Sequence, residues 1–370
     1  MKTLTSAEHA AALACRDLTD PAEGPHAIQL VIDRLETHLA HVWGVPVRRD
    51  PGPRIVAVAD NYDQLGYTPD AATRDSRYSR YLDARTMLRS HTTARIPHLL
   101  PTVGSEVLLS VPGICYRRDS IDRQHSATPH QLDLWRVRRA GPALTEADLE
   151  QMAGLVVGAV LPGRRWWTVP SQHPYTLAGR EIYVDDGEDG VEIGECGLAH
   201  PRLLHAAGRP TCTGLAMGLG LDRILMLAKG VTDIRLLRSN DQRVAVQMLL
   251  DLEPYQPISA TPATVRDLSI AMASDMDLEL IGDQVRSILG RSADAVEDVK
   301  ILQRTSYDAL PAAAIARMGM HPGQDNILLR LVLRHPTRTL TASEGNAIRD
   351  TAYLGLHQGV AQEWAGRVTT

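Results

Sequence analysis

The residues best suited to chemistry lie in the stretch CYRRDSIDRQHSATPHQLDLWRV, residues 115–137, where two β-type segments flank a polar loop. Arg117 and Asp119 precede the loop, and strand alternation after it places Gln131 and Asp133 on one face. An arginine fork matches two phosphate oxygens at once. A carboxylate beside an amide suits a free ammonium group. A phosphate and an ammonium group together suggest a site where ATP meets an amino acid.

The elements around this hairpin are those that must position it. Apolar spacing predicts a helix over 26–42, a short strand over 54–59, a loop-like region over 60–80, and strand end, turn and helix over 87–100. Beyond the hairpin we expect a helix capped by Thr145 and running to about residue 160, then strands and turns over 165–205. Glycines at 214–220 permit a tight passage into a helix over 221–229, which places Arg223 in its first turn, where free amides favour anions.

The C-terminal third reads as a separate α/β unit. Residues 253–264 contain three prolines and read as a linker. After it we expect strands over 267–273, 299–304 and 326–335, and helices over 277–289 and from 341 to about 356. Thr341 and Glu344 form a capping box at the last helix. This order is that of a ferredoxin-like split βαβ module.

Composition limits the class of protein. The chain has 370 residues, 44% of them hydrophobic, and a net charge of −5, so a nucleic-acid partner would need a local basic patch. The four cysteines form no CxxC motif, which argues against a zinc site or a disulfide framework and favours a reducing compartment. We see no signal peptide and no membrane-spanning run, and therefore expect a cytoplasmic protein.

Together, the hairpin, the His-Thr-Thr turn at 91–93 and the glycine–arginine helix at 214–230 resemble the class II aminoacyl-tRNA synthetase core. Within that class the chain resembles the phenylalanyl-tRNA synthetase type, in its single-chain organellar arrangement. The resemblance implies an α+β fold: an antiparallel-sheet catalytic core over 24–252 after an N-terminal segment over 1–23, the linker over 253–264, and a ferredoxin-fold anticodon-binding domain over 265–370. RDLS at 266–269 and LRLVLRHPTRTLTASEGNAIRD at 329–350 carry the second part.

The resemblance assigns roles residue by residue. Arg117 matches the arginine that grips the ATP α-phosphate, and Arg223 the one on the γ-phosphate; both are the catalytic candidates. Asp119 and Pro129 fall at ATP-contacting positions, and Glu192 at an acidic position near ATP and its Mg²⁺, the implied metal contact. The implied amino-acid-binding residues are Tyr81, His91, Thr93, Gln131, Asp133, His173, Tyr175, Ala216 and Met217. Pro53 matches the proline of the first class II motif, and Asn61-Tyr62-Asp63 a family Asn-Phe-Asp.

The implied reaction has two steps: the amino-acid carboxylate attacks the α-phosphorus, then the tRNA terminal ribose attacks the adenylate. Holding the two anions together and neutralising charge on the phosphorus supplies much of the rate. The implied cofactors are ATP and Mg²⁺, and the implied partners an amino acid and a tRNA, tRNA-Phe or a related one. The resemblance implies no separate partner subunit.

Departures from the family pattern gather in the amino-acid pocket. His173-Pro174-Tyr175-Thr176 replaces Phe-Pro-Phe-Thr, Asp133 is one methylene shorter than the family's glutamate, and Glu195 stands where glycine is usual. A polar pocket puts phenylalanine as substrate in doubt and favours a hydroxylated or heteroaromatic ring. The chain also contains no phenylalanine, and we hypothesise that this protects its own synthesis when phenylalanyl-tRNA is scarce or mischarged. Near-normal phenylalanine content in close homologues with the same pocket would contradict that hypothesis.

Several interpretations stay open from sequence alone. His91 could be a structural histidine, and His173 and Tyr175 could be packing substitutes for phenylalanine. Arg330, Arg334 and Arg338 could track a tRNA backbone or form a solvated face. Two rival functions remain: an amino-acid-activating ligase of specialised metabolism, favoured by the altered pocket, and a non-catalytic tRNA-binding regulator, disfavoured by the phosphate-binding arginines.

Overall fold

A computed structural model describes residues 2–258 and 262–361, which form two compact units. The first unit comprises 1–117, 128–237 and 245–256, and the second comprises 118–127, 238–244 and 257–370. Each unit is described by itself. Residues 259–261 of the expected linker and 362–370 of the expected second domain lie outside the described residues.

The first unit is built on a seven-stranded sheet in the order β1-β4-β5-β9-β8-β7-β6. Every neighbouring pair is antiparallel except β1 with β4. Its strands are β1 Val47–Arg49, β4 Val107–Ile114, β5 His130–Arg138, β6 Trp166–Pro170, β7 Thr176–Val184, β8 Val191–Ala199 and β9 Thr213–Gly220. The expected antiparallel-sheet core and the α+β fold class are confirmed.

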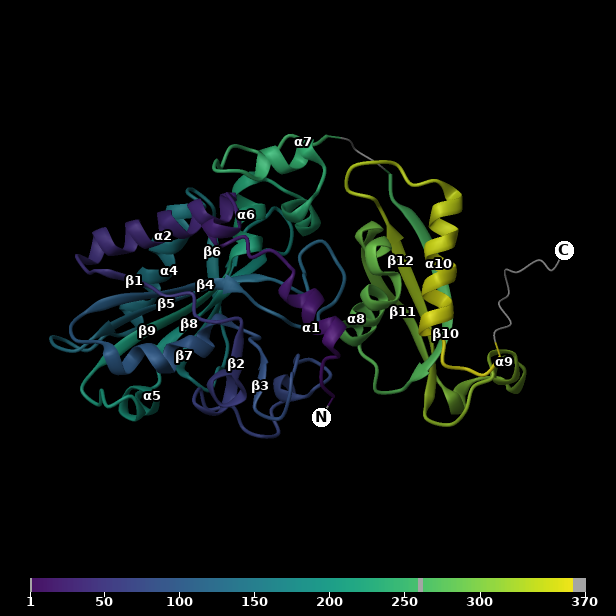
Figure 1. Cartoon of the computed structure of the whole chain (residues 1–370), viewed down its shortest axis with the longest axis horizontal. Helices are drawn as coiled ribbons and strands as arrows, with labels where there is room; N and C mark the ends of the chain where they lie inside the picture. The colour runs from purple at the N-terminus through teal and green to yellow at the C-terminus, as the bar shows by residue number, and fades with distance from the viewer. Residues whose placement is uncertain (1, 259–261, 362–370) are drawn as a thin grey trace. The chain divides into compact units, whose positions relative to one another are not determined.

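Helices cover both faces of this sheet (Figure 1). On one side lie α2 Ala27–Trp43, α4 Glu146–Val160 and α6 Leu221–Lys229, which contact one another and the central strands. On the other side α3 Ile96–Leu99 and α5 Pro201–Ala206 pack, through Ile96 and Leu203, onto Trp135 of β5 and Ala216 of β9. The short α1 Ser6–Leu13, α7 Gln242–Ala245 and the hairpin of β2 Ile55–Ala57 with β3 Thr86–Leu88 lie outside the main sheet.

Local sequence signals account for where these helices begin and end. The α2 helix buries one apolar stripe and stops at Gly44, whose φ of 62° is open to glycine at little cost. Thr145 and Asp148 form a reciprocal capping box at α4. The predicted helix over 221–229 is confirmed to the residue, with Arg223 in its first turn.

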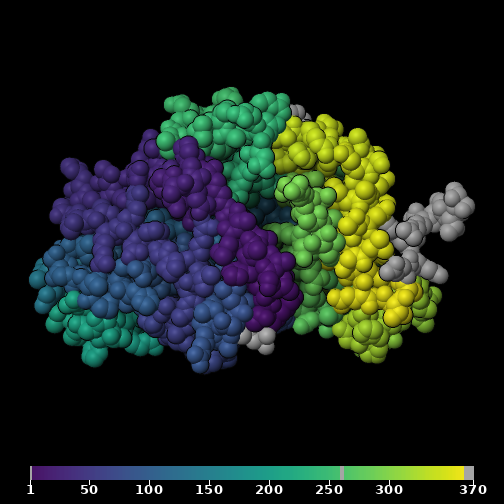
Figure 2. Space-filling view, in the orientation of Figure 1, coloured from purple at the N-terminus to yellow at the C-terminus, as the bar shows by residue number. Residues whose placement is uncertain are grey.

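The second unit is a three-stranded antiparallel sheet in the order β10-β12-β11. Its elements are β10 Thr264–Ala273, α8 Leu278–Leu289, β11 Val296–Ser306, α9 Ala312–Met318, β12 Gln324–Leu333 and α10 Ala342–Leu356. All five predicted elements are present, and the Thr341–Glu344 capping box is confirmed. The prediction missed α9. Helix α10 packs on the sheet with one face. The other face of the helix is exposed and is drawn in yellow in Figure 2.

One segment of the predicted catalytic domain belongs to the second unit instead. Within residues 118–127, Ile121 lies in the second unit's core and its carbonyl accepts from Val299 of β11 at 3.0 Å. Arg123 donates to the buried Glu297 carboxylate at 2.6 Å. The predicted boundary therefore differs from the contact grouping, which also assigns 238–244 to the second unit.

No helix among the described residues is long and apolar enough to span a bilayer.

Candidate functional site

Strand register brings two carboxylates to one gap on the sheet of the first unit. Gly218 of β9 pairs with Asp133 of β5 on one side and with Glu195 of β8 on the other. Because paired residues point to the same face, all three positions share one face of the sheet. A Cβ placed on Gly218 would lie 3.9 Å from Asp133 Oδ2 and 3.8 Å from Glu195 Oε1. The missing side chain thus leaves Asp133 and Glu195 facing the same space.

Asp133 is a buried carboxylate held by three donors. Its Oδ2 accepts from the hydroxyls of Thr92 and Thr93 at 2.8 and 2.9 Å, and its Oδ1 accepts from the Trp135 indole at 3.1 Å. Burial raises the pKa of Asp133 to about 6, although these hydrogen bonds lower it. Among the described residues Asp133 forms no ion pair, so this buried carboxylate is a suitable anchor for an incoming ammonium group. Gln131, two residues earlier on the same face, accepts from Cys115 Sγ at 3.4 Å.

Glu195 forms a second polar group with His173 and Tyr175. The Glu195 carboxylate pairs with His173 Nε2 and accepts from the Tyr175 hydroxyl at 2.5 Å. Burial alone would raise the pKa of Glu195, but His173, Tyr175 and Arg117 together outweigh it and hold that pKa below its ordinary value. Burial likewise opposes the charge on His173, yet Glu195 raises the pKa of His173. The pair is therefore an ion pair beside the Tyr175 hydroxyl.

Arg117 is anchored at one end and open at the other. The Asn61 side chain bonds Ser90 twice: it donates to the Ser90 hydroxyl at 2.8 Å and accepts from the Ser90 amide at 3.1 Å. Arg117 Nε then donates to the Ser90 carbonyl at 3.1 Å. Among the residues that the structure describes, the two terminal nitrogens of Arg117 have no hydrogen-bond partner. A fixed guanidinium with an open fork is suited to bidentate contact with a phosphate.

Arg223 reaches Glu192 from the first turn of α6. Its Nη1 donates to the Glu192 carboxylate at 2.6 Å and to the Glu192 carbonyl oxygen at 3.0 Å. The structure therefore brings together two residues that the sequence analysis assigned to the triphosphate and its metal. Both side chains are only partly exposed, at 20% and 36%.

An aromatic wall borders the candidate site. Tyr67 lies 6.0 Å from His91 and 6.3 Å from Tyr175 between ring centroids, and Tyr175 stacks on Trp135 at 6.4 Å. Both ring nitrogens of His91 are buried and have no hydrogen-bond partner within the described chain. Burial, and then the charge of Arg117, lowers the pKa of His91 to about 4. His91 is thus a neutral ring at neutral pH with two unused polar atoms.

Sequence reasoning missed Tyr67, since residues 60–80 read only as loop. The signal that existed was one of three tyrosines in a charged stretch, the one directly after Leu65-Gly66, and this signal is weak. The structure makes this segment begin with a π-helical turn, Ala59–Asp63, which buries Asn61 and Tyr62 and delivers Tyr67 to the wall.

Two predicted amino-acid-binding residues are not brought to the candidate site. Met217 is buried beside Leu134 and Cys196 and points to the face of β9 opposite Ala216 and Gly218, which does not favour its assignment; contact with the amino acid stays a prediction. Tyr81 packs in a core cluster, and its hydroxyl donates to the Arg74 carbonyl at 2.6 Å. Tyr81 thus packs against Tyr62, whereas Tyr67 supplies the aromatic wall, and contact of Tyr81 with the amino acid stays a prediction.

The remaining ATP candidates lie on the loop between β4 and β5. The Pro129 carbonyl accepts from the Cys115 amide at 2.8 Å, at the point where β5 begins. Asp119 lies in the segment 118–127 of the second unit, where its carboxylate accepts from the Ser120 amide at 2.9 Å. Their contacts with ATP stay predictions.

The three predicted tRNA-binding arginines all form ion pairs inside the second unit. Arg330 makes a bidentate pair with Asp267 at 2.8 Å. Arg334 pairs with Glu297 at 2.7 Å and Arg338 with Glu344 at 2.8 Å. These pairs favour the interpretation as a solvated face, and tRNA contact stays a prediction.

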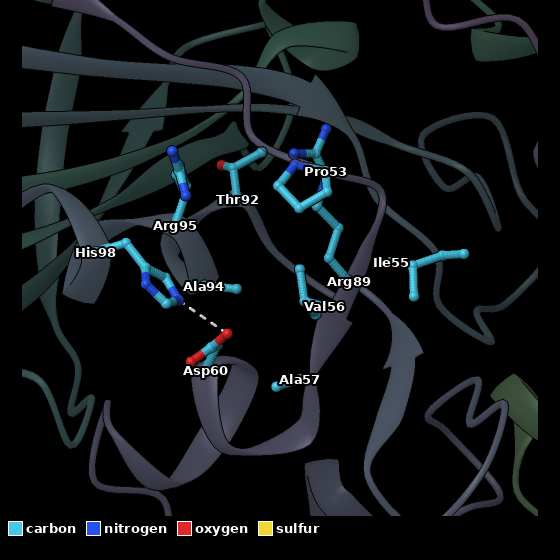
Figure 3. Close-up of a pocket in the computed structure, with 10 residues that line it drawn as sticks. All are labelled: Pro53, Ile55, Val56, Ala57, Asp60, Arg89, Thr92, Ala94, Arg95 and His98. Atoms are coloured by element: carbon cyan, nitrogen blue, oxygen red, sulfur yellow. Dashed lines mark ion pairs between the residues drawn. The ribbon is translucent and has the colours of Figure 1, made fainter.

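A small cavity is lined in part by Thr92 of the His-Thr-Thr turn (Figure 3). It has a volume of about 110 Å³, includes Pro53 and Arg89 in its lining, and is bordered by an ion pair of His98 with Asp60 at 2.9 Å. A pocket for an amino acid or nucleotide is usually at least about 300 Å³. This cavity is therefore too small to hold either substrate.

Magnesium fits this site only if Glu192 and the phosphates of the substrate bind the ion together. No cluster of three or more His, Cys, Asp or Glu side chains that could hold a metal occurs in the described ranges. Glu192 supplies one carboxylate, which suits the habit of Mg²⁺ of binding one or two carboxylates together with substrate phosphates and water.

An antiparallel sheet that presents two arginines for phosphates and a buried carboxylate for an ammonium group is the arrangement of a class II synthetase core. Residues 18–248 match the family described as tRNA synthetases class II core domain (F), and the chain belongs to this family. It is 28% identical over 363 residues to the mitochondrial phenylalanine–tRNA ligase of Mus musculus, covering 86% of this chain and 77% of that protein. It is 27% identical over 350 residues to the probable mitochondrial phenylalanine–tRNA ligase of Drosophila melanogaster, with 80% and 74% covered. A phenylalanine–tRNA ligase alpha subunit of Gemmatimonas aurantiaca is 32% identical over 245 residues, with 62% and 71% covered.

Proposed function

We propose that this chain activates an aromatic amino acid with ATP and transfers it to tRNA, either tRNA-Phe or a related tRNA. The observation that carries the proposal is that one unit contains both Arg117, whose two terminal nitrogens can bind a phosphate, and Asp133, whose carboxylate is held by three hydrogen bonds. A pure tRNA-binding regulator would have no use for that pairing. The family and the phenylalanine–tRNA ligases named above support the same activity.

The chain's own groups suit each part of the first step. Ionised Asp133 binds the amino group of the substrate, and the aromatic wall of Tyr67 and Tyr175 excludes water from its side chain. The substrate carboxylate attacks the α-phosphorus, Arg117 neutralises charge on the phosphoryl oxygens, and pyrophosphate leaves. Arg223 holds the departing phosphates. Mg²⁺ would be held by Glu192 and the phosphates and would add further neutralisation there.

In the second step a hydroxyl of the tRNA terminal ribose attacks the carbonyl of the adenylate, and AMP leaves. We propose that the chain does this without a different partner subunit. Similarity to the two mitochondrial relatives spans 86% and 80% of the chain, whereas similarity to the alpha subunit spans 62%. All four cysteines are free, which suits the cytoplasmic location that we propose.

The purified chain, with no other subunit added, provides the test. We expect ATP and an aromatic amino acid to support pyrophosphate exchange, and a tRNA pool to become acylated. Exchange without acylation of any tRNA would favour the specialised-metabolism ligase, an alternative that the Glu195–His173 pair already favours. Absence of both reactions would contradict the proposal.

A further inference from the structure

On the sheet face beside Asp133, small residues line the surface as far as the carboxylate of Glu195. Gly218 lies between Asp133 and Glu195, and in the adjacent row Ala216 pairs with Gly197. The Glu195 side chain therefore stands where the small residues stop. An amino acid held at Asp133 by its ammonium group would extend its side chain across Gly218 toward Glu195. This geometry rests on the function proposed above.

The group at the far end is rich in hydrogen-bond acceptors. Tyr175 has given its only hydroxyl hydrogen to Glu195, so its oxygen offers lone pairs alone. Each Glu195 oxygen accepts one hydrogen bond, from Tyr175 or His173, and keeps further acceptor capacity. A side chain that carries an O–H or N–H donor would satisfy these atoms, whereas a plain hydrocarbon ring would cover them without a partner.

Charge balance argues for an uncharged side chain. The positive His173 already compensates Glu195, and the substrate ammonium compensates Asp133. A cationic side chain would have to compete with His173 for the same carboxylate. An anionic side chain would meet two negative groups, Asp133 and Glu195, around one gap.

We propose that Glu195, positioned by His173 and Tyr175, selects uncharged aromatic amino acids that carry a ring O–H or N–H donor and rejects the plain benzyl side chain. Sites built to hydrogen-bond a substrate hydroxyl reject the analogue without it by factors of up to about 10⁴–10⁵. Glu195 is only partly buried, with 30% of its side chain exposed, so we expect a preference on the order of 10².

Pyrophosphate exchange tests this selection when kcat/KM is measured with five amino acids. The panel is phenylalanine, 3-hydroxyphenylalanine, tyrosine, 4-aminophenylalanine and O-methyltyrosine, which resembles tyrosine but lacks the donor. We expect one or more of the three donor-bearing rings to exceed phenylalanine by about 100-fold, and O-methyltyrosine to be as poor as phenylalanine.

The variants locate the effect. In Glu195→Gly the preference should fall at least about tenfold, because phenylalanine gains activity while the donor-bearing ring loses it. Glu195→Gln keeps the size of the side chain and should give an intermediate ratio, which protects the test if the glycine variant folds poorly. The matched control is Glu188→Gln, which removes an exposed carboxylate from the turn between β7 and β8 and should leave the ratio unchanged.

The outcomes separate this inference from the proposed function. If the parent uses phenylalanine as well as every donor-bearing ring, and both Glu195 variants keep that ratio, the selection is overturned while the activity stands. If neither the parent nor the Glu195 variants exchange with any of the five amino acids, the proposed function and the selection fail together. Exchange with phenylalanine by the Glu195→Gly variant alone would support the selection.

Discussion

Arg223 and Glu192 are bound to each other at two points: Arg223 Nη1 donates to the Glu192 carboxylate at 2.6 Å and to its backbone carbonyl at 3.0 Å. The helix α6 supplies the arginine and the strand β8 supplies the glutamate. Because one contact uses the backbone, Glu192 orients the guanidinium even where its carboxylate is altered. Glu192 is thus a positioning residue for Arg223 as well as the candidate metal contact.

Two substitutions separate these roles. Arg223→Ala should lower kcat/KM for ATP in pyrophosphate exchange by about 10²-fold or more, since it removes a charge from the leaving phosphates. Glu192→Gln should lower it by only about tenfold at saturating Mg²⁺ and should raise the Mg²⁺ concentration needed for half-maximal rate. The control is Arg180→Ala, which breaks an exposed pair with Glu146 and should be silent. Equal losses in both variants, with no shift in Mg²⁺ dependence, would contradict this division.

The Asn61–Ser90–Arg117 chain of hydrogen bonds predicts a remote effect on ATP. Asn61 is fully buried, so Asn61→Ala would leave the Ser90 segment without both bonds and Arg117 without a fixed anchor. We expect KM for ATP to rise about tenfold, whereas KM for the amino acid should change little. Steady-state exchange kinetics at varied ATP and varied amino acid would reveal the difference. A rise confined to the KM for the amino acid would show that Asn61 supports a different part of the site.

Asp133 should set an acidic limit on amino-acid binding. Its pKa of about 6 means that the carboxylate becomes neutral as pH falls through that value, and a neutral acid attracts an ammonium group weakly. Below pH 6 the kcat/KM for the amino acid should drop about tenfold per pH unit, whereas KM for ATP should not follow. A flat profile between pH 7 and pH 5 would contradict the role of Asp133 as the ammonium anchor.

The same carboxylate should reduce the stability of the fold. Its folded pKa of about 6 exceeds the unfolded value of 3.8, so the stability it contributes is complete below pH 3.8 and is lost as pH rises through about 6. Asp133→Asn should therefore raise the free energy of unfolding at pH 7.5 by about 2 kcal/mol while abolishing exchange. The Thr92 and Thr93 hydroxyls can turn to accept from the new amide, and the Trp135 indole still meets an oxygen. Urea unfolding at pH 7.5 would measure the change in the free energy of unfolding, and a decrease in the Asp133→Asn variant would contradict this prediction.

Local signals in the sequence were sufficient for much of the fold. The capping boxes of Thr145 and Thr341 each involve a residue three positions away, so they can be read without knowing the tertiary structure. The glycines before Leu221 and the apolar face after it fixed α6 and the place of Arg223. Helix α9 was missed because it has only seven residues, too few for a periodic pattern.

The candidate site depends on contacts that are not local. Glu195 lies on β8, whereas His173 lies on the loop between β6 and β7, and no spacing in the sequence reveals that the two side chains meet. The placement of Met217 away from the candidate site has a simple cause: its neighbour Ala216 lies on the site's face of β9, and adjacent residues in a strand face opposite sides. The hairpin indicated that Arg117 binds a phosphate and the family resemblance specified the α-phosphate, whereas the anchor through Asn61 and Ser90 could be seen only in three dimensions.

Glu297 should stabilise the segment 118–127 within the second unit. Its side chain is 3% exposed and pairs with Arg123 at 2.6 Å and Arg334 at 2.7 Å. Glu297→Gln should lower the free energy of unfolding by about 1–2 kcal/mol, because the buried carboxylate that pairs with both arginines loses its charge. The loss is limited because both arginines stay partly exposed to water. Lys300→Ala, which removes an exposed pair with Asp298, is the matched control. Equal unfolding curves for the Glu297 variant and the parent would show that Glu297 does not stabilise this segment.

Pyrophosphate exchange by Arg117→Ala tests the central claim most directly, namely that the open fork of Arg117 binds the phosphate at which the reaction occurs. The assay should use the best aromatic amino acid for the parent chain, with Arg180→Ala as the control for loss of an arginine. We predict that the Arg117 variant folds like the parent and loses exchange by about 10³-fold, whereas the Arg180 variant keeps it. Exchange by a folded Arg117→Ala variant at the rate of the parent would contradict the claim.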